Sequence, residues 1–317
     1  MRRLIAVMAH IFRISFFLFA ALLLPACSWL GFDDDDEDTS ADRARRVTAI
    51  QSESAPVMGA PRGETMAERR LRSVYDKQLA LYARLDSEGA DLSDPEYDRL
   101  IAEVLTEYQS YLSDYPEEVH GFIFYGKMLR DIGQRDDANK AFLQANRLDE
   151  NIAVVKQQIG NYLAEDGEPA VALAYYMSAA ELKPDEPIYA YQIGELLYTY
   201  RKELIESQAL EATLLDQQMI EAFAHAHQLN PSDRQLTQRY AEAYFDVAQP
   251  DWPKALLLWQ ALEGSARDPV ERDWARLQEA RVLIIMGRND EARTVLNEVS
   301  QPGFQEARDT LFSQLPS

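Results

Sequence analysis

The stretch AVVKQQIGNYLAEDGEPAVALAYYMSAAELKPDE, residues 153–186, decides the fold, because its small and large residues recur along the chain at one spacing. Gly126, Gly160 and Gly194 are each 34 residues apart. The same step relates four further pairs: Gly133 and Gly167, Ala138 and Ala172, Phe142 and Tyr176, and Ala145 and Ala179. A fixed period of this length predicts that one structural unit is repeated in series.

Each repeat is expected to be a pair of antiparallel helices, neither of which can bury its apolar stripe alone. Gly160 on the first helix and Ala172 on the second are small, so the two helices can approach closely. Tyr176 supplies a large side chain to the second helix. Gly167 can end the first helix, and Pro184 ends the connection to the next repeat.

This register resembles the tetratricopeptide repeat, a family whose period is 34 residues. The copy over 153–186 has the family's residues at Ile159-Gly160, Leu163, Gly167, Ala172, Tyr176, Ala179 and Pro184. The resemblance implies an all-α fold, a right-handed superhelical solenoid of antiparallel helix pairs. We expect the solenoid to occupy residues 65–317, with about six helix pairs and a closing helix from Phe304 to Leu315.

The first helix pair is expected ahead of the quoted copy. The segment from Met66 to Leu85 supplies one helix. The second begins at SDPEY, with Ser93 or Asp94 as its cap and Pro95 in the first turn. It is expected to end just before Pro116.

An insertion interrupts the register in the second half of the chain. Phe223, Ala226 and Pro231 come 47 residues after Tyr176, Ala179 and Pro184, which implies 13 inserted residues around YRKELIESQALEA, Tyr200 to Ala212. Two further copies follow, one with Tyr240-Ala241, Tyr244, Ala255 and Trp259 and the other with Ala280, Leu283, Gly287, Ala292 and Leu296. Either the insertion only lengthens a helical connection, or Tyr200, Arg201 and Lys202 form a protruding edge that a partner contacts.

Residues 1–26 have the pattern of an export signal. A basic start is followed by the apolar run ISFFLFAALLL, residues 14–24, which spans only about half of a bilayer core as a helix. The sequence LPAC resembles the lipobox of bacterial lipoproteins at Leu24, Ala26 and Cys27, although Pro25 is less usual there. The resemblance implies cleavage before Cys27 and lipidation of that cysteine, and the alternative is an uncleaved anchor.

The segment from Cys27 to residue 64 is expected to be a disordered acidic tether. Asp33 to Asp38 reads DDDDED, without the glycine and alternating ligand spacing of a calcium loop. Residues 39–64 have no sustained apolar period and contain small, turn-forming residues. Ser28 follows the cysteine where inner-membrane retention usually has Asp, which favours the outer membrane, facing the periplasm.

Charge and cysteine content exclude several kinds of partner and site. The chain has a formal net charge of −21, so phosphate backbones repel it and nucleic acid is not an expected partner. A single cysteine excludes an intramolecular disulfide and a Cys-rich metal site. We expect its partner to be a protein or peptide of the bacterial envelope.

No catalytic or cofactor motif is present in the sequence. His225 and His227 are two apart on a predicted helix and therefore point in different directions, whereas a helical metal pair needs a spacing of three or four. We therefore expect no catalytic residues, no cofactor and no metal site.

The resemblance also implies which side chains line the binding groove, because in the family the first helix of each pair forms the concave surface. These groove positions are His120, Ile123, Lys127, Arg130, Gln157, Asn161, Tyr191, Glu195, Tyr198, Gln238, Glu242, Phe245, Trp274, Leu277 and Arg281. Aromatic rings, amides and a few fixed charges suit peptide recognition. For Tyr191 and Tyr198, packing between repeats is the alternative to a groove position.

The sequence therefore predicts a lipid-anchored scaffold or adaptor that faces the periplasm and binds a protein or peptide for the assembly of an envelope complex. One alternative is a periplasmic small-ligand binder or enzyme with its site in the groove. Another is a structural subunit that self-assembles through its repeat ends.

Overall fold

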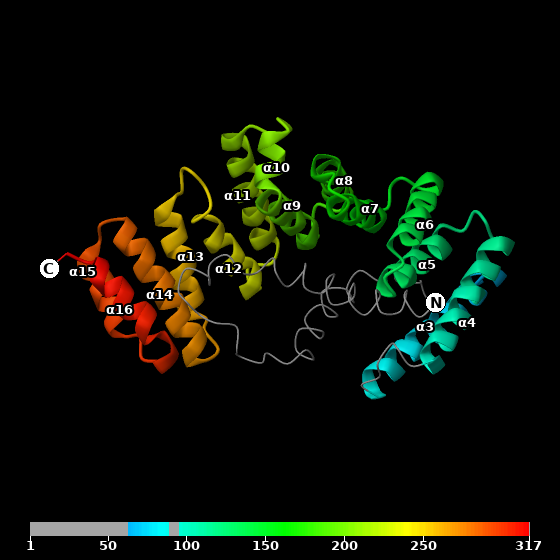
Figure 1. Cartoon of the computed structure of the whole chain (residues 1–317), viewed down its shortest axis with the longest axis horizontal. Helices are drawn as coiled ribbons and strands as arrows, with labels where there is room; N and C mark the ends of the chain where they lie inside the picture. Colours follow the sequence, from blue (N-terminus) through cyan, green and yellow to red (C-terminus); the bar gives the residue numbers. More distant parts are fainter. Residues whose placement is uncertain (1–62, 89–94, 317) are drawn as a thin grey trace. The chain divides into compact units, whose positions relative to one another are not determined.

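The computed structural model describes residues 63–88 and 95–316, and their regular structure is entirely helical (Figure 1). This confirms the predicted all-α repeat fold. The predicted signal peptide, Cys27 and the tether as far as residue 62 lie outside the described residues. None of the described helices is long and apolar enough to cross a membrane. Two compact units are present, an amino-terminal unit that ends at Glu168 and a carboxy-terminal unit that begins at Pro169.

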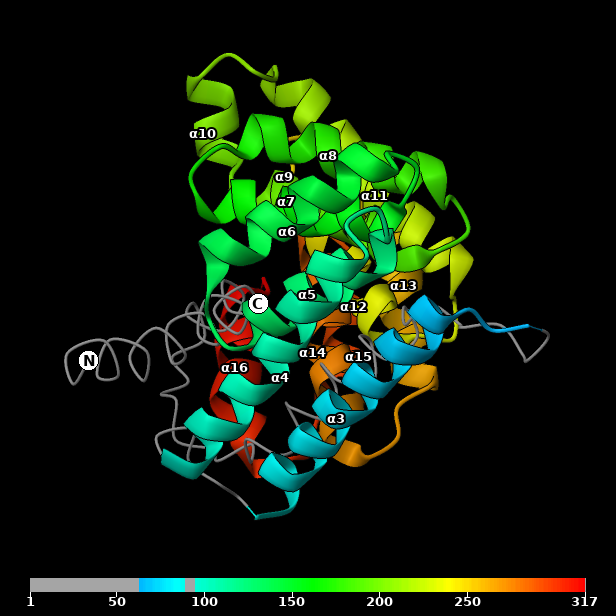
Figure 2. The same cartoon turned by 90° about the vertical axis from the view of Figure 1, so that its right-hand side faces the viewer.

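The amino-terminal unit consists of helices that pack against their neighbours in chain order. They are α3 (Met66–Glu88), α4 (Pro95–Asp114), α5 (Val119–Asp131), α6 (Arg135–Leu148) and α7 (Ala153–Glu165). Helix α3 pairs with α4 and α5 pairs with α6, as the sequence predicted (Figure 2). Pro95 occupies the start of α4, where its missing N–H costs no hydrogen bond.

Reciprocal hydrogen bonds define the start of α3. The Thr65 main-chain N–H donates to Glu68 Oε2 at 2.7 Å, and the Glu68 N–H donates to Thr65 Oγ1 at 3.1 Å. This capping box satisfies two amide donors that the first turn of a helix leaves without partners. Helix α3 therefore has a well-defined start at Thr65.

The carboxy-terminal unit contains the remaining helices. They are α8 (Pro169–Leu182), α9 (Pro187–Thr199), α10 (Arg201–Glu206), α11 (Ala212–Leu229), α12 (Arg234–Ala243), α13 (Trp252–Gly264), α14 (Pro269–Ile285), α15 (Asn289–Asn297), the short 3₁₀ turn η2 (Pro302–Phe304) and α16 (Gln305–Gln314). Helix α9 pairs with α11, α12 with α13 and α14 with α15, while α16 packs on α14 and α15 (Figure 1).

Three first helices end in the same glycine turn. Gly133, Gly167 and Gly287 have φ of +79°, +85° and +73°, a conformation that glycine adopts without steric cost. In each case the following N–H donates back across the turn at 2.8 Å: Gln134 to the Leu129 carbonyl, Glu168 to Leu163, and Arg288 to Leu283. These are the hydrogen bonds of a Schellman cap, so the repeated glycine marks a repeated backbone geometry.

Close approach of the paired helices depends on two other glycines. A Cβ placed on Gly126 would lie 2.9 Å from the ring of Phe142, and one placed on Gly194 would lie 2.6 Å from the ring of Phe223. Both rings are buried on the second helix of the same pair. The small first-helix residue and the large second-helix residue of the predicted register therefore pack directly against each other.

The insertion forms the short helix α10 between α9 and α11. Arg201 stands where three other copies have the turn glycine, so the Schellman turn is absent there. Leu204 is fully buried, and the Leu210 N–H donates to the Leu204 carbonyl at 3.1 Å. In both views α10 lies at one edge of the carboxy-terminal unit (Figure 1, Figure 2). The insertion therefore adds a packed element and does more than lengthen a connection.

Candidate functional site

The predicted groove residues of the amino-terminal unit occupy α5 and α7. They lie as follows: His120 is exposed in the first turn of α5, Lys127 and Arg130 are half-buried further along it, and Gln157 and Asn161 are half-buried on α7. Ile123 does not fit the expectation, because it is 2% exposed and belongs to the core. The Ile123 side chain therefore packs in the core and does not line a groove.

A polar network connects α3, α5 and α7. Arg130 Nη1 donates to Gln158 Oε1 at 2.8 Å, and Arg130 Nη2 lies 2.6 Å from Asp131 Oδ1. The Tyr82 hydroxyl donates to the other Asp131 oxygen at 3.1 Å. Burial lowers the pKa of Lys127, and the nearby Arg130 charge adds to this effect. Arg130 thus links α5 to α7 by a hydrogen bond and is also partly exposed on the surface predicted to be the groove.

Several predicted groove residues of the carboxy-terminal unit lie around a residue that was not predicted, Arg239 on α12. Arg239 Nε donates to Glu195 Oε1 on α9 at 2.6 Å, and its Nη1 lies 3.8 Å from Asp246 Oδ2. The Arg239 side chain is only 7% exposed and that of Glu195 is 14% exposed. The geometry is that of a buried ion pair, in which each charge compensates the other and loss of either partner would leave a buried charge alone.

Aromatic rings enclose the Arg239 guanidinium. Its Cζ lies 4.4 Å from the centroid of the Tyr198 ring and 4.5 Å from that of Phe223. The ring of Tyr191 meets Phe223 edge-on, with centroids 5.9 Å apart. Tyr191 and Tyr198 are half-buried, whereas Phe223 is buried. The two tyrosines therefore combine packing with partial exposure.

Three carboxyl groups surround this arginine. Burial raises the pKa of Glu195, Glu242 and Asp246, and the attraction of the Arg239 charge opposes that rise without cancelling it. Gln238 Nε2 donates to Glu242 Oε1 at 2.8 Å. We define the carboxy-terminal site as Tyr191, Glu195, Tyr198, Gln238, Arg239, Glu242 and Asp246.

Replacing Glu242 with glutamine should raise the melting temperature at neutral pH. Because the folded chain holds a proton on Glu242 more tightly than the unfolded chain does, stability falls as pH rises through the raised pKa. Glutamine keeps the shape and the acceptor but carries no charge. The gain should be present at about pH 7.5 and disappear as the pH approaches about 4, where unfolded glutamate is itself half protonated.

Thermal unfolding across this pH range measures the effect. Glu221→Gln, at an exposed position on α11, is the matched control and should leave the melting temperature unchanged at every pH. A lower melting temperature for Glu242→Gln at pH 7.5 would contradict the assignment of an unfavourable buried charge.

The last predicted groove residues extend the surface toward α14. Arg281 lies over the ring of Phe245, with its Cζ 4.0 Å from the centroid. The ring centroids of Phe245 and Trp252 are 5.3 Å apart, and those of Trp274 and Phe304 are 6.3 Å apart. Leu277 is a second departure from the expectation, since it is 1% exposed and belongs to the core.

Arg201 of the insertion takes part in a structural bridge. It forms an ion pair with Asp216 Oδ1 on α11, and Asp216 Oδ2 accepts the Ala248 N–H at 2.9 Å. Lys202 remains exposed on α10. Only part of the predicted protruding edge is therefore available to a partner.

The two neighbouring histidines have different surroundings, as their spacing predicted. His225 is exposed, whereas His227 Nδ1 lies 3.0 Å from Thr237 Oγ1. Burial lowers the pKa of His227, and the charge of Lys254 contributes. Within residues 63–88 and 95–316, no three His, Cys, Asp or Glu side chains are grouped so that they could hold a metal ion.

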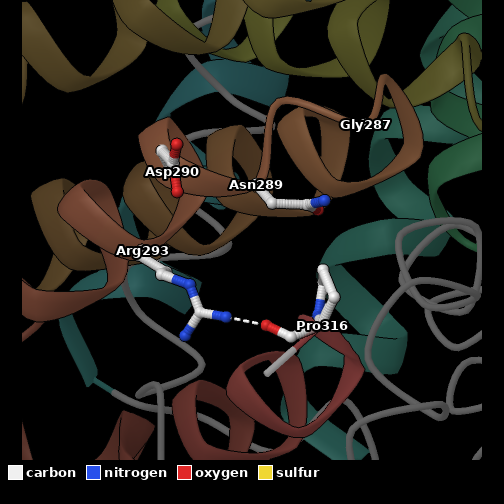
Figure 3. A pocket seen from close by; sticks show the side chains of 5 residues that line it. All are labelled: Gly287, Asn289, Asp290, Arg293 and Pro316. Atoms are coloured by element: carbon white, nitrogen blue, oxygen red, sulfur yellow. Dashed lines mark hydrogen bonds between the residues drawn. The ribbon is translucent and has the colours of Figure 1, made fainter.

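A shallow hollow in the carboxy-terminal unit has none of the residues of the carboxy-terminal site in its lining (Figure 3). It is lined by Gly287, Asn289, Asp290, Arg293 and Pro316. The Arg293 guanidinium already donates to the Pro316 carbonyl, so the one cation of the lining is engaged. The hollow therefore offers a ligand little apolar surface and no free cation from its lining.

Sequence reasoning missed Arg239, yet the register contains a signal for it. The residue two positions before the small first-helix residue is polar in four successive copies: Gln158, Gln192, Arg239 and Gln278. The first, third and fourth of these are buried. A polar residue repeated at a buried position predicts hydrogen bonding between helices, and an arginine there predicts an acidic partner.

Comparison with known proteins supports the fold. No family model matches the sequence, and no curated protein matches it. YrrB, described as a TPR protein with an unusual peptide-binding site, is similar in structure at a TM-score of 0.50 and 15% identity, over 64% of this chain and 96% of that one. PilF of Pseudomonas aeruginosa gives a TM-score of 0.51 at 12% identity, over 78% of this chain and 100% of that one.

A third similar structure is the C-terminal part of a TPR repeat-containing protein from Cytophaga hutchinsonii. It gives a TM-score of 0.50 at 18% identity and covers 79% of this chain and 98% of that one. Identities this low carry no information on partners. The helix pairs, their register and these three similarities together show that the chain has the fold of tetratricopeptide-repeat proteins.

Proposed function

We propose that this chain is a lipid-anchored scaffold that binds a protein or peptide partner in the bacterial envelope through the first helices of its repeats. Its body would be held at a membrane by acyl chains on Cys27, and the tether would let it reach partners from the inner face of the outer membrane. The partner would belong to an envelope complex that the scaffold helps to assemble.

One observation supports the binding role above others. Arg239 on α12 links two helices whose side chains the family register assigns to the groove: Tyr191, Glu195 and Tyr198 on α9, and Gln238 and Glu242 on α12. Half-buried aromatic rings provide contact area, and amide and charged groups provide directional hydrogen bonds. The peptide-binding site attributed to YrrB shows that a protein of similar fold binds peptides.

The membrane anchor is supported by sequence alone. Lipidation of Cys27 would be consistent with an apolar run that is too short to span a bilayer and is followed by a small residue and a cysteine. Firm anchoring needs more than one acyl chain. The lipobox resemblance implies several acyl chains on Cys27.

Site-specific photo-crosslinking in bacterial cells tests the binding role. A crosslinker that replaces Tyr198 should attach to one defined envelope protein, and a crosslinker at Glu221, exposed on α11, should not. Attachment at both positions to the same set of abundant proteins, or at neither position, would contradict a partner site on the first helices.

Fatty-acid labelling of the same cells tests the anchor. The chain should incorporate a clickable fatty acid and fractionate with membranes, and Cys27→Ser should abolish both properties. An unlabelled chain with a free thiol at Cys27 would contradict the anchor and leave the binding role standing.

A further inference from the structure

We propose that the carboxy-terminal site takes a basic side chain, lysine or arginine, of the bound peptide, with Glu242 as the carboxylate that receives it. This inference rests on the proposed function, because it assumes that the first-helix surface binds a peptide. It adds the chemical class of the residue that this surface selects.

The balance of charges in the site leaves one carboxylate without a cation. Glu195 is paired with Arg239 at 2.6 Å. Asp246 lies 3.8 Å from the same guanidinium and is also attracted by Arg281 and by Arg201. Arg201 is itself paired with Asp216, so these two charges offset each other. Glu242 has the Gln238 amide as its hydrogen-bond donor and takes part in no ion pair among the described residues. Three carboxylates thus face two guanidinium groups, and the excess negative charge falls on Glu242.

A half-buried carboxylate without a cation is unfavourable, because burial removes part of its hydration and no positive charge compensates for the loss. A lysine ammonium or an arginine guanidinium from a partner would supply the missing charge. Arginine would add paired N–H donors that match the two carboxylate oxygens. The half-buried rings of Tyr191 and Tyr198 offer apolar surface for the methylene stem of either side chain.

Arg239 provides an independent indication of a ligand. Its side chain is more than nine-tenths buried, and its Nη2 has no hydrogen-bond acceptor. Phe223, one of the two rings over the guanidinium, belongs to the core, whereas the other, Tyr198, is half-buried. A main-chain carbonyl of a bound peptide is an acceptor of the kind that Nη2 lacks. The site thus lacks one acceptor and one cation, and a peptide that carries a basic residue supplies both.

Binding of defined peptides to the full chain tests this selection. The probes are pools of fluorescent peptides about ten residues long, with random flanks and a central Lys, Arg, Gln or Glu. Fluorescence anisotropy at physiological salt should show that the Lys and Arg pools bind about 10-fold more tightly than the Gln pool, which corresponds to about 1.4 kcal/mol. The Glu pool should bind most weakly.

Two variants distinguish the site from general attraction to an acidic chain. Glu242→Gln keeps the side-chain shape and should reduce binding of the Lys and Arg pools to the level of the Gln pool. Glu221→Gln removes the same charge from an exposed position on α11 and should retain the full preference. Circular dichroism confirms that both variants are folded.

Each other outcome has a definite meaning. Equal binding of all pools would overturn the basic anchor and leave the scaffold function intact. Equal losses for Glu221→Gln and Glu242→Gln would also overturn it, because the net charge of −21 would then account for the preference. If no pool binds and Tyr198 crosslinks to no protein in cells, the proposed function fails together with this inference.

Discussion

Replacing Gly194 with valine should destabilise the carboxy-terminal unit by about 3 kcal/mol. A Cβ at this position would lie 2.6 Å from the Phe223 ring, well inside van der Waals contact. The ring cannot yield easily, because Phe223 is buried and is held by Tyr191 and the Arg239 guanidinium. A β-branched residue would force α9 away from α11. Urea unfolding of the variant and the natural chain measures the difference.

Gly264→Ala is the matched control for this substitution. Gly264 is the last residue of α13, and a Cβ there would meet nothing within 4 Å. Alanine should therefore leave stability unchanged or raise it by up to about 1 kcal/mol, through its better helix propensity. Gly194→Ala should fall between the two variants. A Gly194→Val chain as stable as the natural one would show that the helix pair is looser than its geometry indicates.

Replacing Arg239 with methionine should cost about 3–5 kcal/mol, the usual effect of removing one partner of a buried ion pair. The substitution leaves the Glu195 carboxylate largely buried without its guanidinium. Methionine fills much of the space between Tyr198 and Phe223, so the lost charge and not a cavity should dominate. Chemical denaturation at pH 7.5 provides the measurement.

The pH dependence of this deficit identifies its cause. Burial already raises the pKa of Glu195, and loss of Arg239 should raise it further. A folded carboxyl that holds its proton more tightly than the unfolded one loses stability as pH rises through its pKa, so the deficit should be largest at neutral pH. It should shrink at about pH 5 and in the double variant Arg239→Met with Glu195→Gln. A deficit that neither change reduces would point to packing alone.

Much of the fold could be predicted because the repeat imposes the same local requirements in each copy. The 34-residue step located the glycines at the ends of α5 and α7, and their positive φ values explain why no other residue is used there. It also marked Gly126 and Gly194 as small residues of the first helices, and the structure shows that Phe142 and Phe223 lie against them. Such features depend on residues that are close in sequence, so they can be recognised in a single sequence.

The candidate site was predicted only in part, because its organising contact joins residues far apart in sequence. The register supplied Glu195 and Glu242 as groove positions but could not show that Arg239 lies between Glu195 and Asp246. Ile123 and Leu277 failed as groove residues, since family positions fix a direction on the helix and not the degree of burial. Apolar side chains at such positions can turn into the core.

The insertion was located correctly by the break in the register, but its structure was not predicted. Neither Gly nor Pro marks its ends, and the sharp change of direction after α10 uses Gln208 at φ of 59°. Its single fully buried side chain, Leu204, gives too little periodicity to predict a separate helix.

One carboxylate, that of Asp216, contacts both the inserted helix α10 and the segment after α12. Asp216 receives Arg201 of α10 on one oxygen and the Ala248 N–H on the other. Asp246 lies two residues before Ala248 and faces Arg239. Loss of the Asp216 carboxylate would therefore remove the partner of Arg201 on α10 and the acceptor of the Ala248 N–H together, so the packing of both segments depends on one side chain.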